Sequence, residues 1–176
     1  IPDLVFYVIG SNMPASVKSL HSANVEPVGF VPDVAPYFES CRVFVAPLRF
    51  GAGMKGKVGQ SISHGLPVVT TRIGAEGMDL QNEKHLLIAD DPQDFADAVV
   101  RLYRDEILWQ RLSAGAIAHV EANYSYAAAQ KRITDIFARA QNQPAQGGSA
   151  EDLDNGIPTY GGSASSCSIK AGGATG

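Results

Sequence analysis

Several residue types that mark common classes of protein are scarce in this chain of 176 residues. Only two cysteines occur, Cys41 and Cys167, and they match neither a disulfide framework nor a metal-binding spacing. The four histidines are scattered and form no paired metal-binding motif. No apolar run approaches the roughly 18 residues that span a bilayer, and we expect no signal peptide. These absences predict a cytoplasmic protein that needs no metal ion or cofactor.

The charges of the chain are unevenly distributed. The net charge is −4, which argues against a nucleic-acid-binding protein with a basic surface. Residues 40–75 nevertheless contain five basic side chains and no Asp or Glu. These basic residues are Arg42, Arg49, Lys55, Lys57 and Arg72. A local reversal of charge of this kind indicates that an anion binds in this segment.

The centre of the basic segment has the features of a phosphate-binding loop. Residues 49–57 (RFGAGMKGK) follow a strand-like run at 43–48 and lead into a short predicted helix. Their three glycines allow the backbone to approach a ligand, so that amide N–H groups can face an oxyanion. Lys55 and Lys57 near the helix N-terminus each cost about 0.3–1 kcal/mol unless an anion offsets them. We predict a bound diphosphate; the alternative is a flexible, solvated basic loop.

The hydrophobic pattern predicts that strands alternate with helices over the first 90 residues. A continuous apolar run at 4–9 indicates a strand that is buried on both faces. Further strands are expected at 24–31, 43–48, 67–71 and 85–89, with short helices at 14–20, 33–40 and 57–64. Alternation at this pace implies βαβ units, and therefore an α/β fold with a Rossmann-like parallel sheet covered by helices on both faces.

Three longer helices are predicted after residue 90. The first has Asp91 as its N-cap and Pro92 in its first turn, and the others cover about 107–123 and 126–140. We expect Trp109 to be a packing residue, and we assign the apolar stripes of the last two helices to the core. These stripes comprise Leu108, Leu112, Ile117, Val120, Ile133, Ile136 and Phe137.

Several short motifs occur along the chain in a defined order. They are Gly29-Phe30-Val31, the helix after Asp33, the run 43–47, the glycine loop, the run 65–71, Gly74-Ala75-Glu76-Gly77 and residues 90–92. Over about residues 2–140 this order resembles the C-terminal half of a GT-B glycosyltransferase, specifically of the retaining group 1 (family 4) enzymes. The resemblance implies a donor-binding domain at 1–141 that lacks its first elements and an N-terminal acceptor domain. We expect the Gly- and Ser-rich tail at 142–176 to be disordered.

The resemblance also implies where the donor binds. In that family a glycine loop and the helix behind it hold the donor diphosphate, which corresponds to residues 51–58 here. The loop at 29–31 would hold the base through main-chain contacts, although an ordinary strand end has the same pattern. Glu76 or the nearby backbone would face the rim of the cleft, or else residues 74–77 form only a turn. The expected donor-binding residues are Gly29, Phe30, Gly51, Ala52, Gly53, Met54, Lys55, Gly56, Lys57, Val58, Gln60 and Glu76.

Two positions that are commonly acidic in the family are not acidic here. The family often has two glutamates separated by seven residues, one facing the donor sugar and one holding the ribose hydroxyls. Counting back from Gly65 places these positions at Ala52 and Gln60. Gln60 can still exchange hydrogen bonds with a diol, whereas Ala52 cannot replace a carboxylate. We therefore assign no catalytic residue, and the departure weakens the expectation of activity more than the expectation of fold.

The resemblance implies a retaining glycosyltransferase of hexosyltransferase type that moves a sugar from a nucleotide-diphosphate donor to an acceptor hydroxyl. Its partners would be the nucleotide sugar and an acceptor glycan, lipid or small molecule bound by the absent N-terminal domain, but no nucleic acid. The full-length enzyme could associate peripherally with a membrane, and this chain alone would be inactive. The alternatives are a nucleotide-sugar-binding or interaction module without turnover and, ranked lowest, a nucleotide-sugar epimerase.

Overall fold

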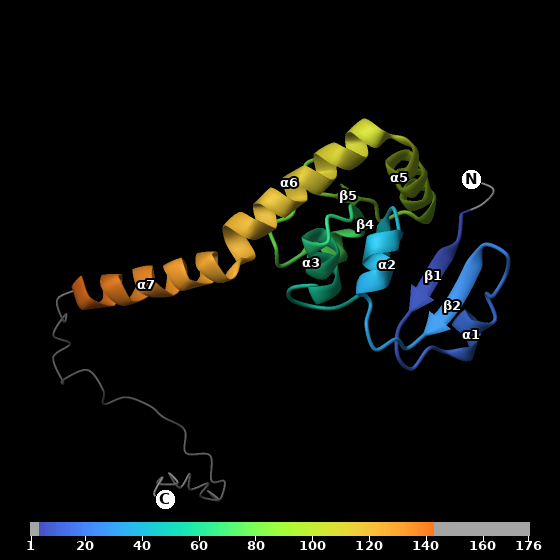
Figure 1. Cartoon of the computed structure of the whole chain (residues 1–176), viewed down its shortest axis with the longest axis horizontal. Helices are drawn as coiled ribbons and strands as arrows, with labels where there is room; N and C mark the ends of the chain where they lie inside the picture. Colours follow the sequence, from blue (N-terminus) through green and yellow to red (C-terminus); the bar gives the residue numbers. More distant parts are fainter. Residues whose placement is uncertain (1–3, 143–176) are drawn as a thin grey trace, which may run out of the picture. The chain divides into compact units, whose positions relative to one another are not determined.

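The computed structural model describes residues 4–142, so the expected tail lies outside the described residues apart from Asn142. Strands and helices alternate as far as residue 88 and are followed by three longer helices (Figure 1). The elements are β1 (Phe6–Ile9), α1 (Ala15–Lys18), β2 (Val25–Gly29), α2 (Ala35–Ser40), β3 (Phe44–Ala46), α3 (Gly56–Ser63), β4 (Val68–Thr70), α4 (Arg72–Ala75), β5 (Leu87–Ile88), α5 (Pro92–Arg104), α6 (Glu106–Tyr124) and α7 (Tyr126–Asn142). None of the described helices is long and apolar enough to cross a membrane.

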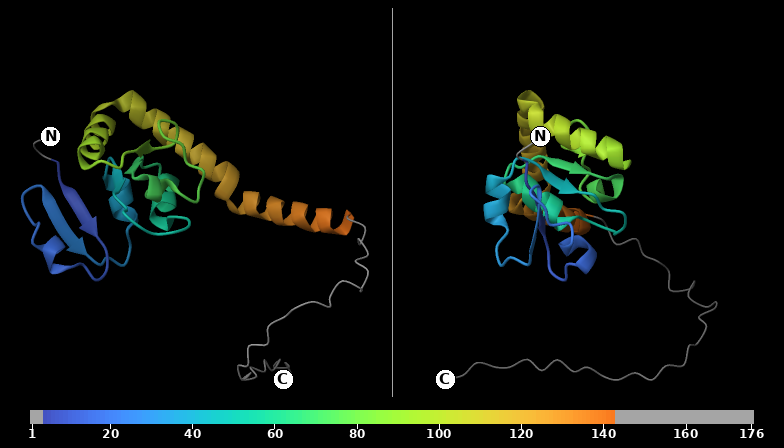
Figure 2. Two further views of the ribbon diagram at one scale, coloured as in Figure 1. Left: turned by 180° about the vertical axis from the view of Figure 1, so that it is seen from behind. Right: turned by 90° about the vertical axis from the view of Figure 1, so that its right-hand side faces the viewer.

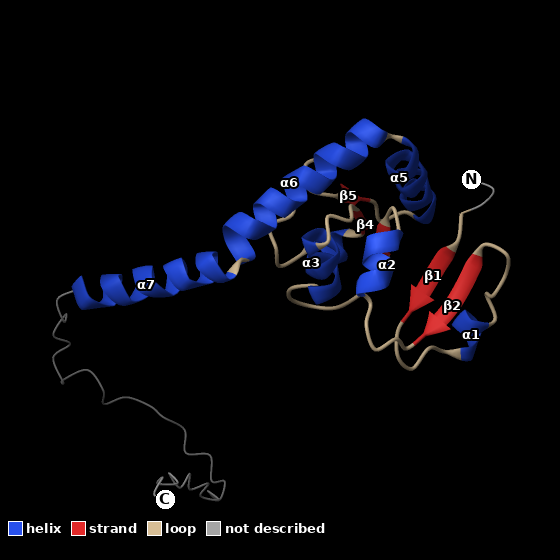
Figure 3. Ribbon diagram, viewed as in Figure 1, coloured by secondary structure: helices blue, strands red, loops and turns tan. Residues whose placement is uncertain are grey.

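The strands pair in parallel, as predicted, and they form two sheets (Figure 3). β3, β4 and β5 make a three-stranded sheet with β4 in the centre, and β1 pairs with β2 in a separate two-stranded sheet. Within the larger sheet Val45 lies opposite Val69, and Val69 lies opposite Leu87. The expected α/β class with parallel strands is therefore confirmed, and the strands are divided between two sheets.

Helices cover both faces of the three-stranded sheet. Successive residues of β4 point to opposite faces, as in any strand. Val68 packs with Val58 and Ile62 of α3, whereas Val69 packs with Leu102 of α5. α6 contributes buried residues to both of these cores and ends at Tyr124, and Ser125 separates it from α7 (Figure 2).

The prediction that residues 4–9 are buried on both faces is wrong. Val5, Phe6 and Tyr7 are 42%, 41% and 42% exposed. A parallel strand becomes buried only when helices cover both of its faces. Among the described strands β1 pairs only with β2, and α1 has four residues, none of them buried. An apolar run of strand length therefore predicted the strand correctly but not its burial.

The last predicted core stripe is also wrong in part. Leu108 and Leu112 of α6 are buried as expected. Ile133, Ile136 and Phe137 of α7 are instead 55%, 63% and 64% exposed. A period of 3.6 residues identifies the apolar face of a helix, whereas burial also requires an element that packs on that face. In α7 the hydrophobic pattern correctly predicts an apolar face, but no element in the described part of the chain packs on that face.

Candidate functional site

Two loops meet at one edge of the three-stranded sheet. β3 leads into residues 47–55 and β4 leads into residues 71–77. The carboxyl ends of parallel strands lie at the same edge, where open α/β sheets bind ligands. A Cβ atom added at Gly77 would lie only 2.8 Å from the backbone nitrogen of Met54 and 2.9 Å from the carbonyl carbon of Gly53. The structure therefore brings together two segments that the sequence suggested separately.

Two threonines at the end of β4 hold these loops in place. The Thr71 hydroxyl donates to the Leu48 carbonyl at 2.6 Å and accepts from the Gly74 amide at 3.2 Å. The buried Thr70 hydroxyl donates to the Ala46 carbonyl at 2.9 Å. No role of this pair was predicted from the sequence. Its signal was two hydroxyl residues in succession at the end of a predicted strand.

The glycine loop has the backbone conformation that its sequence suggests. Gly51 and Gly53 have positive φ angles of 123° and 74°, which residues with side chains rarely adopt. Gly56 has no positive φ and is the first residue of α3. No side chain caps the start of α3, so its first amide groups are available to a ligand. The loop therefore combines close backbone approach with helix amides, as an anion site requires.

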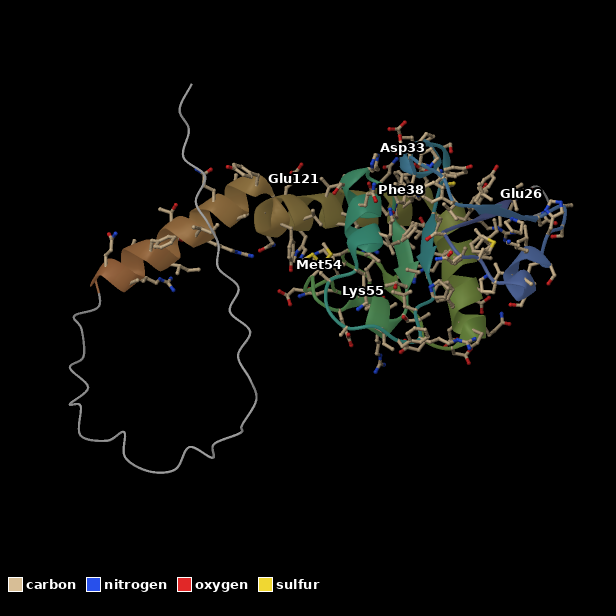
Figure 4. The ribbon with its side chains drawn as sticks, turned by 90° about the horizontal axis from the view of Figure 1, so that it is seen from below. Glu26, Asp33, Phe38, Met54, Lys55 and Glu121 are labelled. Atoms are coloured by element: carbon tan, nitrogen blue, oxygen red, sulfur yellow. The ribbon has the colours of Figure 1, made fainter. Side chains whose placement is uncertain are left out.

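The two lysines of the loop behave differently. The Lys55 ammonium donates to the carbonyl oxygens of Gly51 and Gly53, at 3.1 and 2.7 Å. Lys55 and its neighbour Met54 precede α3 directly (Figure 4). The exposed Lys57 ammonium donates to the side-chain carbonyl oxygen of Gln60 at 3.0 Å. Because an ammonium group has three donors, Lys57 retains donors for an anion.

Some of the other expected site residues lie at the edge of the three-stranded sheet, and others lie in or directly after the two-stranded sheet. Ala52 and Met54 are exposed in the loop, and Glu76 is exposed directly before Gly77. Gly29, with a φ of 84°, ends β2 in the other sheet, and Phe30 after it is 73% exposed.

Val58 differs from the other expected site residues in being buried. Its side chain is 1% exposed in the core, and its amide already donates to the Lys55 carbonyl at 2.9 Å. Val58 lies in the first turn of α3, where packing and the helix's own hydrogen bonds engage both its side chain and its amide, and its role in donor binding remains a prediction.

The basic segment is less free of acid than its sequence suggests. The Arg42 guanidinium pairs with Glu106 and donates to the Tyr103 carbonyl at 2.8 Å. It also lies over the ring of Trp109, whose indole N–H donates to the Arg42 carbonyl at 2.7 Å. Trp109 is thus a packing residue, as predicted. Arg42 therefore stabilises the tertiary structure, because it joins parts of the chain that are more than 60 residues apart.

Arg72 is engaged in a similar way. Its guanidinium Nε lies 3.1 Å from a carboxylate oxygen of Asp90, and its backbone amide donates to the other oxygen at 2.9 Å. This ion pair joins the start of α4 to the segment after β5. Arg42 and Arg72 are thus both paired with carboxylates. The basic side chains of residues 40–75 that are left for a ligand lie in the glycine loop.

A pair of histidines, which appeared scattered in the sequence, lies beside the end of residues 71–77, the segment that contains α4 and is called the α4 turn below. The rings of His85 and His119 are 4.4 Å apart between centroids. A ring nitrogen of His119 lies 2.8 Å from the Met78 carbonyl, and the Gln81 amide donates to His85 Nδ1 at 3.1 Å. Because Met78 follows Gly77, the pair ties α6 to the segment that supports the glycine loop.

We predict that His85 makes the stability of the fold depend on pH. Burial lowers the pKa of His85 below its usual value, and the nearby His119 and Lys84 lower it further. A depressed pKa means that the unfolded chain binds the extra proton more readily. The free energy of unfolding is therefore full above about pH 6.5 and falls as the pH drops below this value toward the folded-state pKa.

Urea unfolding between pH 5 and 7.5 measures this effect. In His85→Asn the side-chain oxygen can still accept from the Gln81 amide but cannot be protonated, so the pH dependence should become shallower. His21→Asn serves as the matched control, because His21 is exposed and pairs only with Glu26 among the contacts described. An equal pH dependence in the parent and His85→Asn would contradict the prediction.

The parallel α/β architecture, with the glycine loop at the carboxyl edge of the sheet, is the fold of a GT-B domain. The family model "Glycosyl transferases group 1" matches residues 1–105, and the chain belongs to this family. Among curated proteins the chain is similar to "Putative glycosyltransferase YtcC" of Bacillus subtilis (strain 168), with 27% identity over 113 residues. The match covers 61% of this chain and 28% of that protein. The chain thus spans about a quarter of the length of the curated relatives it matches.

Solved structures show the same fold. HepE of Anabaena, in complex with UDP, has a TM-score of 0.67 and 14% identity, covering 79% of this chain and 42% of that one. Sucrose-phosphate synthase of Thermosynechococcus elongatus has a TM-score of 0.56 and 20% identity, covering 67% and 30%. The C-terminal domain of the group 1 glycosyltransferase LpcC of Francisella tularensis has a TM-score of 0.51 and 15% identity, covering 63% and 60%.

Proposed function

We propose that this chain is the nucleotide-sugar-binding half of a retaining glycosyltransferase of hexosyltransferase type. The full-length enzyme would transfer a sugar from a nucleotide-diphosphate donor to an acceptor hydroxyl without a metal ion. A further domain would bind the acceptor, which is a glycan, a lipid or a small molecule. The enzyme would work in the cytoplasm, with peripheral membrane contact if its acceptor is a lipid.

The observation that carries this proposal is the contact between the glycine loop and the α4 turn at the carboxyl edge of the sheet. Negative charge builds up on the leaving diphosphate as the glycosidic bond breaks. The Lys57 ammonium and the first amides of α3 would offset this charge from fixed positions. The structures of HepE with UDP and with UDP-glucose support a nucleotide sugar as the ligand.

The remaining residues have proposed roles around this anion site. Gln60 would exchange hydrogen bonds with the ribose, and its pairing with Lys57 places the two side chains beside each other on α3. Glu76 would face the donor sugar from the α4 turn, because the next residue contacts the glycine loop. Gly29 and Phe30 would hold the base through their backbone.

A second candidate function is nucleotide-sugar binding without turnover. The presence of Ala52 and Gln60 at the two family positions that are commonly acidic favours it. An epimerase ranks lowest, because it needs an acid and a base, and Glu76 supplies one carboxylate at most. Transfer by the full-length protein to an acceptor would exclude the module, and donor epimerisation without acceptor would favour the third candidate.

The first experiment is calorimetry of the chain with UDP, GDP and ADP. We expect one of the three to bind, with an affinity that falls as salt rises because the contact is ionic. Lys57→Met keeps the length of the side chain but removes its charge, and should weaken binding roughly tenfold.

Lys18→Met is the matched control, because it makes the same chemical change on the exposed end of α1. It should leave the affinity unchanged. The proposal fails if no nucleotide binds at millimolar concentration, or if Lys57→Met binds as tightly as the parent.

A further inference from the structure

The side chain of Lys55 is folded onto its own loop. Its ammonium lies within hydrogen-bonding distance of two carbonyl oxygens, 3.1 Å from that of Gly51 and 2.7 Å from that of Gly53. Its aliphatic stem passes over Gly51, where an added Cβ would lie 3.9 Å from the Lys55 Cε. Lys55 is half-buried, whereas Lys57 is exposed. The two lysines of the motif are therefore not equivalent.

The two carbonyl contacts determine where the loop amides point. In a trans peptide the carbonyl of one residue and the N–H of the next point in opposite directions. The carbonyls of Gly51 and Gly53 are turned toward the Lys55 ammonium, so the amides of Ala52 and Met54 are turned away from it. The Met54 nitrogen lies against Gly77, whereas Ala52 is exposed. The hydrogen bond from Lys55 to the Gly51 carbonyl thus directs the Ala52 amide, which belongs to the same peptide group, away from Lys55 and toward the outside of the loop.

The charges of the two lysines are balanced in different ways. A cation at the start of a helix is unfavourable, because the helix dipole is positive there. Two carbonyl oxygens offset the charge of Lys55 within the protein itself. Among the described residues, the Lys57 ammonium has one hydrogen bond, to the neutral side chain of Gln60. Its charge is therefore the one that a bound anion would offset.

We propose that Lys55 is a positioning residue that holds the glycine loop in its anion-binding conformation before the ligand arrives, and that Lys57 contacts the anion. The ligand named here, a nucleoside diphosphate, rests on the proposed function. The shape of the loop does not, because it is a property of the protein without ligand. Removing either lysine weakens binding, but only the loss of Lys55 loosens the loop.

The test compares Lys55→Met, Lys57→Met and the control Lys18→Met by two measurements on the whole chain. The first is ¹⁵N relaxation of the amides at 51–54 without ligand. We expect order parameters near 0.8 in the parent, Lys57→Met and Lys18→Met, and below about 0.6 in Lys55→Met. Lys55→Arg, which can also donate to two carbonyl oxygens, should restore the rigid values. Thermal unfolding of each variant checks that the fold remains intact.

The second measurement is UDP binding at low and high salt. Lys55→Met should bind roughly tenfold more weakly than the parent and keep the same dependence on salt, because it loses order and not an ionic contact. Lys57→Met should bind roughly tenfold more weakly and depend less on salt. A Lys55→Met loop that stays rigid, together with a reduced salt dependence, would overturn the inference and make Lys55 a direct ligand. If the parent binds no nucleotide, the proposed function fails, and the relaxation data still decide whether Lys55 positions the loop.

Discussion

Replacing Gly77 by alanine should destabilise the fold by about 2–4 kcal/mol and disrupt the glycine loop. Two costs add at this position. The φ of 85° is strained for any residue with a side chain. The new methyl group would also lie 2.8–2.9 Å from backbone atoms of Gly53 and Met54, which cannot rotate away as a side chain could. Because the loop must move, we expect nucleotide affinity to fall by roughly tenfold or more.

Gly65→Ala separates the two costs. Gly65 has a similar φ of 74°, but a Cβ there would meet only side-chain atoms of Ser113 and Ile117, both at an ordinary 3.6 Å. This control should cost about 1–2 kcal/mol from backbone strain alone. It should also leave the glycine loop undisturbed. Urea unfolding and UDP calorimetry of both variants provide the comparison, and equal losses for Gly65→Ala and Gly77→Ala would contradict the close contact between the loops.

Gly74→Ala should cost about 2–4 kcal/mol for a different reason. Gly74 has an ordinary φ, so the backbone itself accepts alanine. The added methyl group, however, would overlap the Thr70 hydroxyl, which is buried and bonded to the Ala46 carbonyl. Rotating Thr70 to relieve the overlap would break that buried hydrogen bond, so neither arrangement is free of cost.

A double-mutant cycle with Thr70→Ala tests this explanation directly. Thr70→Ala alone should destabilise the fold by about 1–2 kcal/mol, because the Ala46 carbonyl loses the Thr70 hydroxyl and keeps only the Leu48 amide as a donor among the described residues. In that background Gly74→Ala should cost less than about 1 kcal/mol, since its nearest remaining neighbours lie 3.2 and 3.3 Å away. Urea unfolding of the four proteins gives the coupling energy. A coupling energy near zero would mean that the hydroxyl is not the obstacle.

Local sequence patterns predicted the elements of the fold well. Asp91 does cap α5, accepting from the amides of Gln93 and Asp94, and Pro92 is the first residue of that helix. The strand, glycine loop and helix at 44–63 also form as expected. These features depend on neighbours within a few residues, which a single sequence displays directly.

The features that the sequence did not predict depend on distant partners. The contact of Gly77 with Met54 joins segments that are 23 positions apart, and Arg42 meets Glu106 at a separation of 64. The exposure of residues 5–7 depends on which elements cover β1, not on β1 itself. The folding back of Lys55 could not be predicted either, because its motif is equally compatible with an ammonium that points to solvent.

The exposed strand β1 has a consequence for how the chain behaves at high concentration. Residues 4–9 read LVFYVI, a run without charge or proline and with strong β-propensity. Proteins usually protect the outer strand of a sheet with lysine, proline or a bulge at its edge, because unpaired N–H and C=O groups recruit strands from other molecules. The irregularity in β1 lies at its last residues, between Val8 and Ile9, and the pairing of Phe6 to Val8 with β2 is regular. The isolated chain therefore carries an aggregation-prone segment on its surface, and a charged substitution at Tyr7 is the simplest change to keep it monomeric.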